Sequence, residues 1–233
     1  MLSDQELMTI HVQALFTHDD HSRLLSVNEP GGGAPAPRLF FGRTWMGNLW
    51  RFRADLPEML IEELEALCAD EPVGKAFHRQ PHHVESYVRL LETHAPGHKL
   101  WMGPAYHCTG QLALSRPVRV ITKTNAQLLR GGFEKLHSEL PTWQPFLGLI
   151  EKGRAVSICR SVRITRVAHE AGVETLPDFR GRGYAMDVVA GWARVVHSMG
   201  AIPLYSTSWE NTASQALAKK LHLMQFGADF HIT

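Results

Sequence analysis

The chain has 233 residues, with 24 Lys and Arg against 23 Asp and Glu, so its formal net charge is +1 with neutral histidines. This near balance gives no reason to expect nucleic acid or an anionic membrane as the main partner. Hydrophobic residues make up 44% of the chain, enough to bury a sizeable core without a disulfide or a metal.

Three widely spaced cysteines, Cys68, Cys108 and Cys159, form no CxxC pair, which argues against a disulfide framework and favours a reducing compartment. The N-terminal stretch carries Asp4 and Glu6 without a cationic start, so it does not resemble a secretory signal. No apolar run approaches the ~20 residues that span a bilayer. We therefore expect a cytoplasmic protein, a monomer or homodimer, with neither membrane nor nucleic acid as a partner.

The N-terminal half predicts a mixture of helices and short strands. Asp55 is the expected start of the second helix, with Pro57 in its first turn. The predicted elements are a helix over 3–15, a loop over 28–37, two short strands within 38–53, and helices over 56–69 and 82–94.

The C-terminal half predicts an α/β or α+β sheet with helices packed on it. Gly153 is expected to supply a positive φ in a hairpin turn, and Gly200 to end the longest helix. The predicted strands are 117–122, 146–150, 155–162, 170–176, 202–206 and 224–232, and the helical segments are 125–140, 183–198 and 213–221.

The turn after Leu176 is rich in glycine and arginine and opens an amphipathic helix. Pro177 ends the preceding strand because it has no N–H to donate. Glycines let the backbone wrap closely around a ligand, and the free N–H groups at a helix start favour an anion. Arg180 and Arg182 add charge-assisted donors. These features predict a diphosphate site, although they also suit a tight turn with solvated arginines.

This turn, Arg180-Gly-Arg-Gly-Tyr-Ala185, resembles the Arg/Gln-x-x-Gly-x-Gly/Ala motif of the GCN5-related N-acetyltransferases (GNAT). A second landmark follows at the family's spacing, where Asn211, Ser214 and Lys220-Leu221-His222-Leu223 resemble the Asn-x-x-(Ser/Ala) helix start and the Lys-Leu-Gly-Phe helix end. The resemblance covers about residues 145–233 and is closest to the FR47-like branch. It implies the GNAT fold, in which helices flank a mixed central sheet, and acetyl-CoA as the cofactor.

The resemblance also implies which residues hold acetyl-CoA. The pantetheine arm would pair with the backbone of the strand before the turn, and the pyrophosphate would sit on the backbone of the turn itself. Asn211 resembles the family asparagine that faces the pantetheine, and it is also suited to cap the helix. The implied cofactor-binding residues are Val173, Thr175, Leu176, Arg180, Gly181, Arg182, Gly183, Tyr184, Ala185, Asn211 and Ser214.

A carboxylate can serve as the base that deprotonates the amine. Glu170 and Glu174 are the candidates on the strand before the turn, on one strand face if no bulge intervenes, and the alignment also admits His169. The family's usual general acid is a tyrosine, but Ala218 stands at that position. The departing thiolate would then take its proton from Tyr205, Ser214 or water, or leave unassisted.

The resemblance divides the chain at about residue 115. Residues 116–233 would form the GNAT domain, and residues 1–115 an additional α/β region, either a degenerate second GNAT-like half or a cap that shapes the acceptor pocket. The expected function is transfer of acetyl from acetyl-CoA to a primary amine of a small molecule, peptide or protein. The main alternative is a non-catalytic acetyl-CoA sensor. No metal site is expected, since Pro81 interrupts the His78–His82 spacing.

Overall fold

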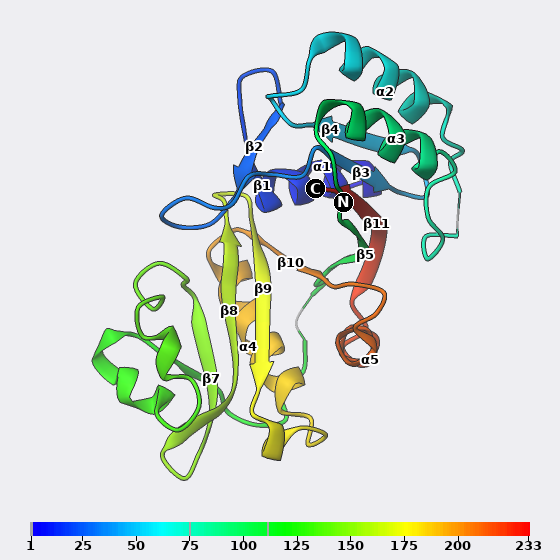
Figure 1. Ribbon diagram of the computed structural model, residues 1–233. Coiled ribbons are helices and arrows are strands. Elements are labelled where there is room, and N and C mark those ends of the chain that lie inside the picture. Colours follow the sequence, from blue (N-terminus) through cyan, green and yellow to red (C-terminus); the bar gives the residue numbers. More distant parts are fainter. Residues whose placement is uncertain (1, 75, 111) are drawn as a thin grey trace. The chain divides into compact units, whose positions relative to one another are not determined.

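The computed structural model describes residues 2–74, 76–110 and 112–233 (Figure 1). The chain forms two compact units, each described by itself below. Unit 1 comprises Met1–Tyr106, Ser206–Thr212 and Gln225–Thr233, and unit 2 comprises His107–Tyr205 and Ala213–Met224.

Unit 1 is a sheet covered by helices. Its strands follow the order β4-β3-β11-β5, and a separate hairpin, β1-β2, lies outside this sheet. The strands are β1 (Phe16–His18), β2 (Leu24–Val27), β3 (Leu39–Arg43), β4 (Asn48–Phe52), β5 (Leu100–His107) and β11 (Met224–Ile232). The helices are α1 (Asp4–Leu15), α2 (Glu58–Asp70) and α3 (Val84–His94).

Alternation along β3 sends successive side chains to two cores. Leu39 and Phe41 join a buried cluster with residues of α2, α3 and β11. Phe40 points the other way, where its ring lies 6.5 Å from that of His11 on α1. Here α1 approaches the sheet closely: a Cβ at Gly42 would lie 2.6 Å from the Met8 Sδ atom, so only glycine fits.

The predictions for this half agree with the structure in most elements. The helix over 3–15, the strand pair within 38–53 and the helices over 56–69 and 82–94 are confirmed to within two residues at most ends. The prediction that Asp55 opens α2 is wrong, because its carboxylate pairs with the Arg53 guanidinium at 2.7 Å and Pro57 occupies the N-cap. The sequence reading missed β1, β2 and β5.

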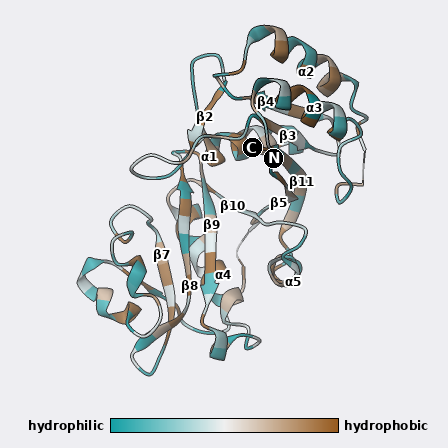
Figure 2. Cartoon of the chain, viewed as in Figure 1, coloured by the Kyte–Doolittle hydropathy of each residue, from teal (hydrophilic) through white to brown (hydrophobic). Residues whose placement is uncertain are grey.

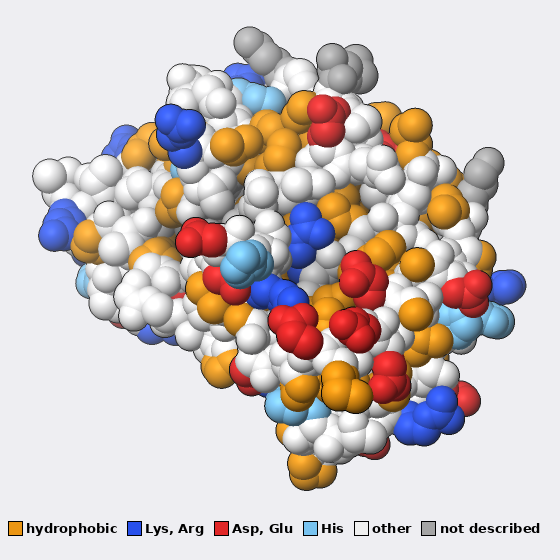
Figure 3. Space-filling model, turned by 90° about the horizontal axis from the view of Figure 1, so that it is seen from above, with side chains coloured by type: hydrophobic (Ala, Val, Ile, Leu, Met, Phe, Trp, Pro, Cys, Tyr) orange, Lys and Arg blue, Asp and Glu red, His pale blue; other side chains and the backbone are white. Residues whose placement is uncertain are grey.

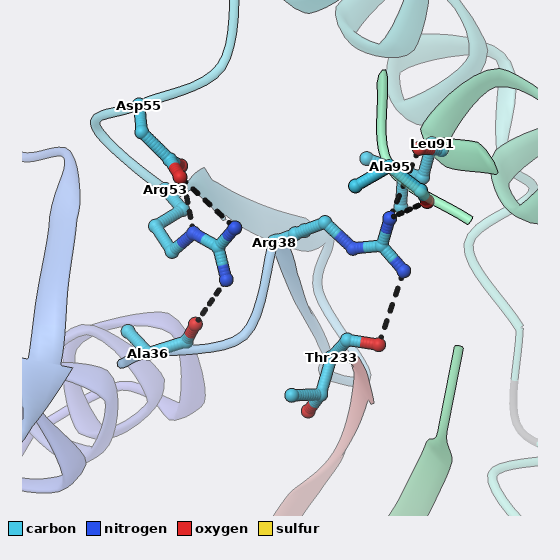
Figure 4. Close-up of polar contacts among 7 residues, drawn as sticks. All are labelled: Ala36, Arg38, Arg53, Asp55, Leu91, Ala95 and Thr233. Carbon is cyan, nitrogen blue, oxygen red and sulfur yellow. Dashed lines mark hydrogen bonds and ion pairs between the residues drawn. The ribbon is translucent and has the colours of Figure 1, made fainter. Parts of the chain in front are cut away.

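Arg38 fastens the C-terminal end of α3 to the end of the chain (Figure 4). Its buried guanidinium donates to the main-chain oxygens of Leu91, Ala95, Gly97 and Thr233. The last carbonyls of a helix lack intrahelical donors, and this single side chain supplies donors at the end of α3.

Unit 2 is built on strands in the order β10-β9-β8-β7-β6. They are β6 (Arg119–Val120), β7 (Phe146–Glu151), β8 (Arg154–Ile164), β9 (Ala168–Thr175) and β10 (Ile202–Ser206). Strands β7, β8 and β9 are antiparallel neighbours, whereas β10 runs parallel to β9. The helices are η1 (Lys123–Leu129), η2 (Glu134–Leu136), η3 (Pro177–Phe179), α4 (Tyr184–Ser198) and α5 (Thr212–Lys220).

Strand β8 carries hydrophobic residues on both faces. Figure 2 shows hydrophobic and hydrophilic bands along this strand. Ile158 packs in a cluster with Leu129, Phe133 and Leu136 of the η1–η2 segment. On the other face, Ser161 accepts a hydrogen bond from the Trp192 indole of α4 at 3.0 Å. The predicted strands 146–150, 155–162, 170–176 and 202–206 are confirmed, and the predicted helical segment 125–140 consists of short 3-10 turns around Gly131-Gly132.

Acidic side chains gather on the face of the molecule shown in Figure 3. The exposed acids of α2 are Glu58, Glu62, Glu63, Glu65 and Asp70, and the apolar Met59 is 77% exposed among them.

Among the described residues, no helix has the length and apolar character needed to cross a membrane.

Candidate functional site

Strand β9 is paired along only part of one edge. Strand β10 pairs with it at Ala168, His169 and Glu170 and then departs. Within residues 2–74, 76–110 and 112–233, the positions of β9 beyond Glu170 pair only with β8, and they are partly exposed. This part of the sheet therefore presents an open strand edge.

Main-chain groups alternate in direction along a strand, which fixes the residues that face the open edge. Leu176 donates its N–H to the Val156 carbonyl of β8 and accepts from the Phe179 N–H, so its backbone is engaged inside the domain. The alternation turns the backbone groups of Val173 and Thr175 away from β8, toward the open edge. Of the three residues predicted to meet the pantetheine, the geometry favours Val173 and Thr175 over Leu176.

The turn that follows is exposed and shaped by two glycines. Gly181 and Gly183 have φ values of +76° and +81°, in the left-handed region that glycine adopts without strain. A Cβ on Gly181 would meet no atom within 4 Å, so the turn is open to solvent. In the described part of the chain, no main-chain acceptor receives the N–H groups of Gly181, Arg182 or Gly183. The first N–H groups of α4 add to these donors because a helix start has no intrahelical acceptors for them.

The two arginines of the turn contact residues that precede them. Arg180 Nε donates to the Thr175 carbonyl at 3.2 Å, and Arg182 Nη2 donates to the Asp178 carbonyl at 2.9 Å. The Arg182 guanidinium also lies 5.1 Å from the centre of the Phe179 ring. Both side chains are exposed, so these single neutral-acceptor bonds are weak competitors for a phosphate. A ligand strand that pairs with Thr175 would displace Arg180 from its carbonyl.

A buried carboxylate on α4 brings a distant segment to the turn. Asp187 is 2% exposed, and its Oδ1 accepts the N–H groups of Ser115 at 2.7 Å and Arg116 at 3.2 Å. Its Oδ2 pairs with Arg116 Nη1 at 3.0 Å. The same nitrogen lies 3.8 Å from the position of a Cβ on Gly183, and the guanidinium lies 5.1 Å from the Tyr184 ring centre. The sequence analysis did not identify Arg116 or Asp187, because residues 71 positions apart show no local pattern that would pair them.

Tyr184 anchors the start of α4 to β7. Its ring is buried, and its hydroxyl donates to a carboxylate oxygen of Glu151. Ala185, the next residue, is partly buried in the first helical turn. The predicted role of both residues rests on their backbone N–H groups, which this anchoring holds in a fixed direction.

Glu170 and Tyr205 lie where β9 and β10 separate. Glu170 is opposite Leu204 in the last pair between the two strands, and Tyr205 is the next residue of β10. Both are buried, at 3% and 2% exposure. Alternation places the two side chains on opposite faces of the sheet. Tyr205 and Ser214 of α5 share a hydrogen bond of 2.6 Å between their hydroxyls.

Glu174 is held in an ion pair. Its carboxylate lies 2.9 Å from Arg160 Nη1, and the Arg160 Nε atom lies 3.3 Å from a Glu139 carboxylate oxygen. The Arg160 guanidinium also lies 4.8 Å from the Trp143 ring centre. The bulge in the β8–β9 ladder interrupts β8, between Ser161 and Arg163. Glu170 and Glu174 therefore share a face of β9, as predicted, but their surroundings differ.

The second family landmark forms the start and end of α5. Asn211 is exposed immediately before the helix, and Ala218 is buried within it. His222 ends the helix with a φ of +52°, and the Leu223 N–H donates to the Ala218 carbonyl at 3.0 Å. This left-handed cap explains why glycine suits the position that His222 occupies.

Neither the cysteines nor the histidines offer a competing centre among the residues described. Cys108 and Cys159 are buried, and burial raises the pKa of the Cys108 thiol to about 12 and that of Cys159 well above its ordinary value. No group of three or more His, Cys, Asp or Glu side chains in the described ranges is arranged to hold a metal ion. His83 instead pairs with Asp70 at 2.9 Å.

The segment that contains this site is similar to a known protein family. Residues 147–225 match the model of a family described as GNAT acetyltransferase. The match contains the open edge of β9, the turn and α4. No curated protein matches the chain.

Two solved structures are similar to this chain over most of its length, and the first of them supports the fold. A Drosophila protein is 12% identical with a TM-score of 0.51, over 82% of this chain and 72% of its own. A GCN5-related N-acetyltransferase-like protein from Streptococcus suis is 16% identical with a TM-score of 0.48, over 85% of each chain. The predicted α/β fold, with helices flanking a mixed sheet, is confirmed.

Proposed function

We propose that residues 116–233 form an acetyltransferase domain that moves the acetyl group of acetyl-CoA onto a primary amine of an acceptor. The observation that carries this proposal is the open edge of β9, which continues directly into an exposed turn with free backbone donors. An extended amide chain that ends in a diphosphate is complementary to both parts. The match of residues 147–225 to a GNAT acetyltransferase model supports the same assignment.

The residues present fit acetyl-CoA. Val173 and Thr175 would pair with the amide groups of the pantetheine arm, and the backbone of Gly181–Ala185, with Arg180 and Arg182, would hold the pyrophosphate. Ser214 of α5 would also contact the pantetheine. When bound, acetyl-CoA supplies the acetyl group as a thioester.

Side chains of this protein would transfer the protons when the amine attacks the thioester directly. Glu170 takes up the proton that the amine loses, either directly or through a water molecule, and Tyr205 gives the proton that the departing thiolate needs. Their positions on opposite faces of the sheet suit these roles, since the two protons move on different sides of the reacting carbon. Glu174 is a weaker candidate for the base because Arg160 pairs with its carboxylate.

A covalent acyl-enzyme route has less support. Cys159 lies on β8 opposite Val173, one strand away from the open edge, and its raised pKa keeps the thiol protonated at neutral pH. The Ser157 hydroxyl shares a hydrogen bond with Thr175 at 2.8 Å and has no histidine partner among the described residues. Neither side chain has an activating base of the kind that a nucleophile requires.

The second candidate function is a non-catalytic acetyl-CoA sensor. The observation that favours it is Ala218, which is fully buried at the position where the family usually has its tyrosine acid. Tyr205 stands in for that tyrosine in the enzyme proposal. Assignment to the FR47-like branch, residence in the cytoplasm and a monomer or homodimer remain part of the proposal.

Calorimetric titration with CoA and acetyl-CoA tests the binding half of the proposal. We expect the wild-type chain to bind both, and Gly183→Asp to lose about 100-fold in affinity, because it places a carboxylate where the diphosphate sits. Gly200→Asp is the matched control, since Gly200 has a φ of +78° with no atom within 4 Å of a Cβ and lies at the other end of α4. Equal losses in both variants, or none in either, would contradict the turn assignment.

Release of the free thiol from acetyl-CoA separates the enzyme from the sensor. A panel of primary amines, including polyamines, amino sugars and lysine peptides, is offered to the wild-type chain. The enzyme proposal expects at least one amine to stimulate release. Binding of acetyl-CoA without amine-stimulated release would favour the sensor.

A further inference from the structure

Arg116 differs from the two arginines of the turn in how it is held. Arg180 and Arg182 each contact one carbonyl near themselves in the sequence. Arg116 comes from a segment 71 residues before Asp187, and three hydrogen bonds from residues 115 and 116 fix it to that carboxylate. Its side chain is nevertheless 46% exposed. The guanidinium is therefore fixed in place while one side of it faces solvent.

The Arg116 guanidinium lies beside the proposed phosphate-binding turn. Arg116 Nη1 lies 3.8 Å from the Cβ position of Gly183, whose N–H is one of the free donors. Only Nη1 of the guanidinium is hydrogen-bonded among the residues that the structure describes. The remaining Nη2 and Nε donors are available to an anion, and a planar guanidinium can give two parallel hydrogen bonds to one phosphate.

Electrostatics require a cation at this place. Asp187 puts a buried negative charge in the first turns of α4, close to where a diphosphate would bring more. Like charges at short range disfavour binding, so a phosphate site here needs the Asp187 charge balanced. Arg116 balances it with one nitrogen and keeps others for the ligand.

We propose that Arg116, positioned by the buried Asp187, is a phosphate-binding residue of this domain. The proposal rests on the proposed function, since the phosphate is that of coenzyme A. The ligand chemistry is a phosphate ester, which CoA carries both in its 5′-diphosphate and in its 3′-phosphate. Asp187 is a positioning residue, which acts by holding the guanidinium beside Gly183.

Binding of three donor fragments to Arg116→Gln tests the assignment. The fragments are CoA, dephospho-CoA, which lacks the 3′-phosphate, and pantetheine, which lacks every phosphate. We expect Arg116→Gln to weaken CoA binding roughly tenfold, the usual loss for one charge-assisted hydrogen bond. Pantetheine binding should not change. A parallel loss for dephospho-CoA assigns Arg116 to the diphosphate, and an unchanged affinity for dephospho-CoA assigns it to the 3′-phosphate.

Arg194→Gln is the matched control. Arg194 also ties the segment before residue 117 to α4, through two donors to the Leu112 carbonyl at 2.7 and 3.1 Å, but it lies two turns further along the helix. It should leave CoA affinity unchanged. Equal losses in both variants would show that CoA binding depends on the connection between this segment and α4. That result would overturn the phosphate role of Arg116.

A double variant separates phosphate binding from charge balance. If Arg116 served only to neutralise Asp187, then Arg116→Gln combined with Asp187→Asn would regain wild-type affinity. Our proposal expects the double variant to stay about tenfold weaker. Wild-type binding of CoA with no effect of Arg116→Gln would overturn this inference and leave the proposed function standing. No CoA binding by the wild-type chain would overturn the proposed function itself.

Discussion

Unit 1 pairs its buried polar groups inside the protein, whereas the turn of unit 2 leaves polar backbone groups open to solvent or a ligand. In unit 1, Asp229 is fully buried, with its carboxylate 2.8 Å from His231 and 3.4 Å from His11. Glu71 accepts the N–H groups of His82 and His83 before α3, and Arg38 satisfies the carbonyls after it. In unit 2, the amides of Gly181 to Gly183 have no main-chain acceptor in the described part of the chain, and the edge of β9 beyond Glu170 pairs with no strand there.

This difference predicts which substitutions change the stability of the fold and which change ligand binding. A buried polar group costs free energy unless it is paired, so unit 1 pairs its charges internally. An exposed donor costs little while water solvates it, and it remains available for a ligand. Substitutions in the first set should therefore change unfolding, and substitutions in the second set should change affinity or turnover.

The largest expected effect is on stability, from Asp229→Asn. Burial by itself would raise the pKa of Asp229, but His11 and His231 outweigh it and hold the pKa well below its usual range. Removing the charge leaves the two histidines without their partner and should cost about 3 kcal/mol of unfolding free energy.

Chemical denaturation measures this loss, with the exposed Asp20→Asn as the control, which should change stability by less than about 0.5 kcal/mol. CoA affinity of the folded variant should equal that of the wild type. A stable Asp229→Asn chain with weakened CoA binding would break the comparison.

Glu170→Gln should lower turnover by about 100-fold and leave CoA affinity unchanged, because it removes a proton acceptor without removing a cofactor contact. Steady-state rates and calorimetric titration give the two quantities. Glu174→Gln is the comparison variant, since Arg160 already pairs with that carboxylate. A larger loss of turnover in Glu174→Gln would exchange the roles of the two glutamates.

Acid should destabilise the chain partly through His169. This side chain is 4% exposed, and burial lowers its pKa from the ordinary value of 6.5. Below pH 6.5 the unfolded chain binds a proton that the folded chain does not, so stability is present above that pH and falls as the pH drops toward the lower folded pKa.

The contribution of His169 is the difference in slope between the wild type and His169→Gln. One proton corresponds to about 1.4 kcal/mol per pH unit, so the variant should show a slope shallower by up to that amount below about pH 6.5. Denaturation curves at several pH values supply the slopes. Identical slopes would mean that His169 titrates alike in both states.

The smallest effect is expected from His222→Gly, which should stabilise the chain by roughly 0.5–1 kcal/mol. His222 holds a φ of +52°, and a left-handed conformation costs a non-glycine residue about 1 kcal/mol or more. Thermal unfolding measures the gain. A loss of stability would indicate that the imidazole makes contacts worth more than the strain.

Local pattern was enough to predict most elements of both units. The strand at 224–232, the helix at 183–198 and the turn at Gly183 follow from periodicity, glycine and proline, which act within a few residues of one another. The missed strand β5 contains Gly103 and Pro104, which depress strand propensity. Its place in the sheet depends on neighbours far away in the sequence.

The sequence by itself determined most of the elements, the glycine-rich turn before α4, and the identity of the candidate glutamates, because each depends on residue type and short-range spacing. Tertiary structure decided that β10 leaves β9 after Glu170, that Arg160 engages Glu174, and that Asp187 brings Arg116 to the turn. These contacts join segments 14 to 71 residues apart. Such pairs form only when packing brings distant segments together, so they cannot be predicted from the spacing of residues along the sequence.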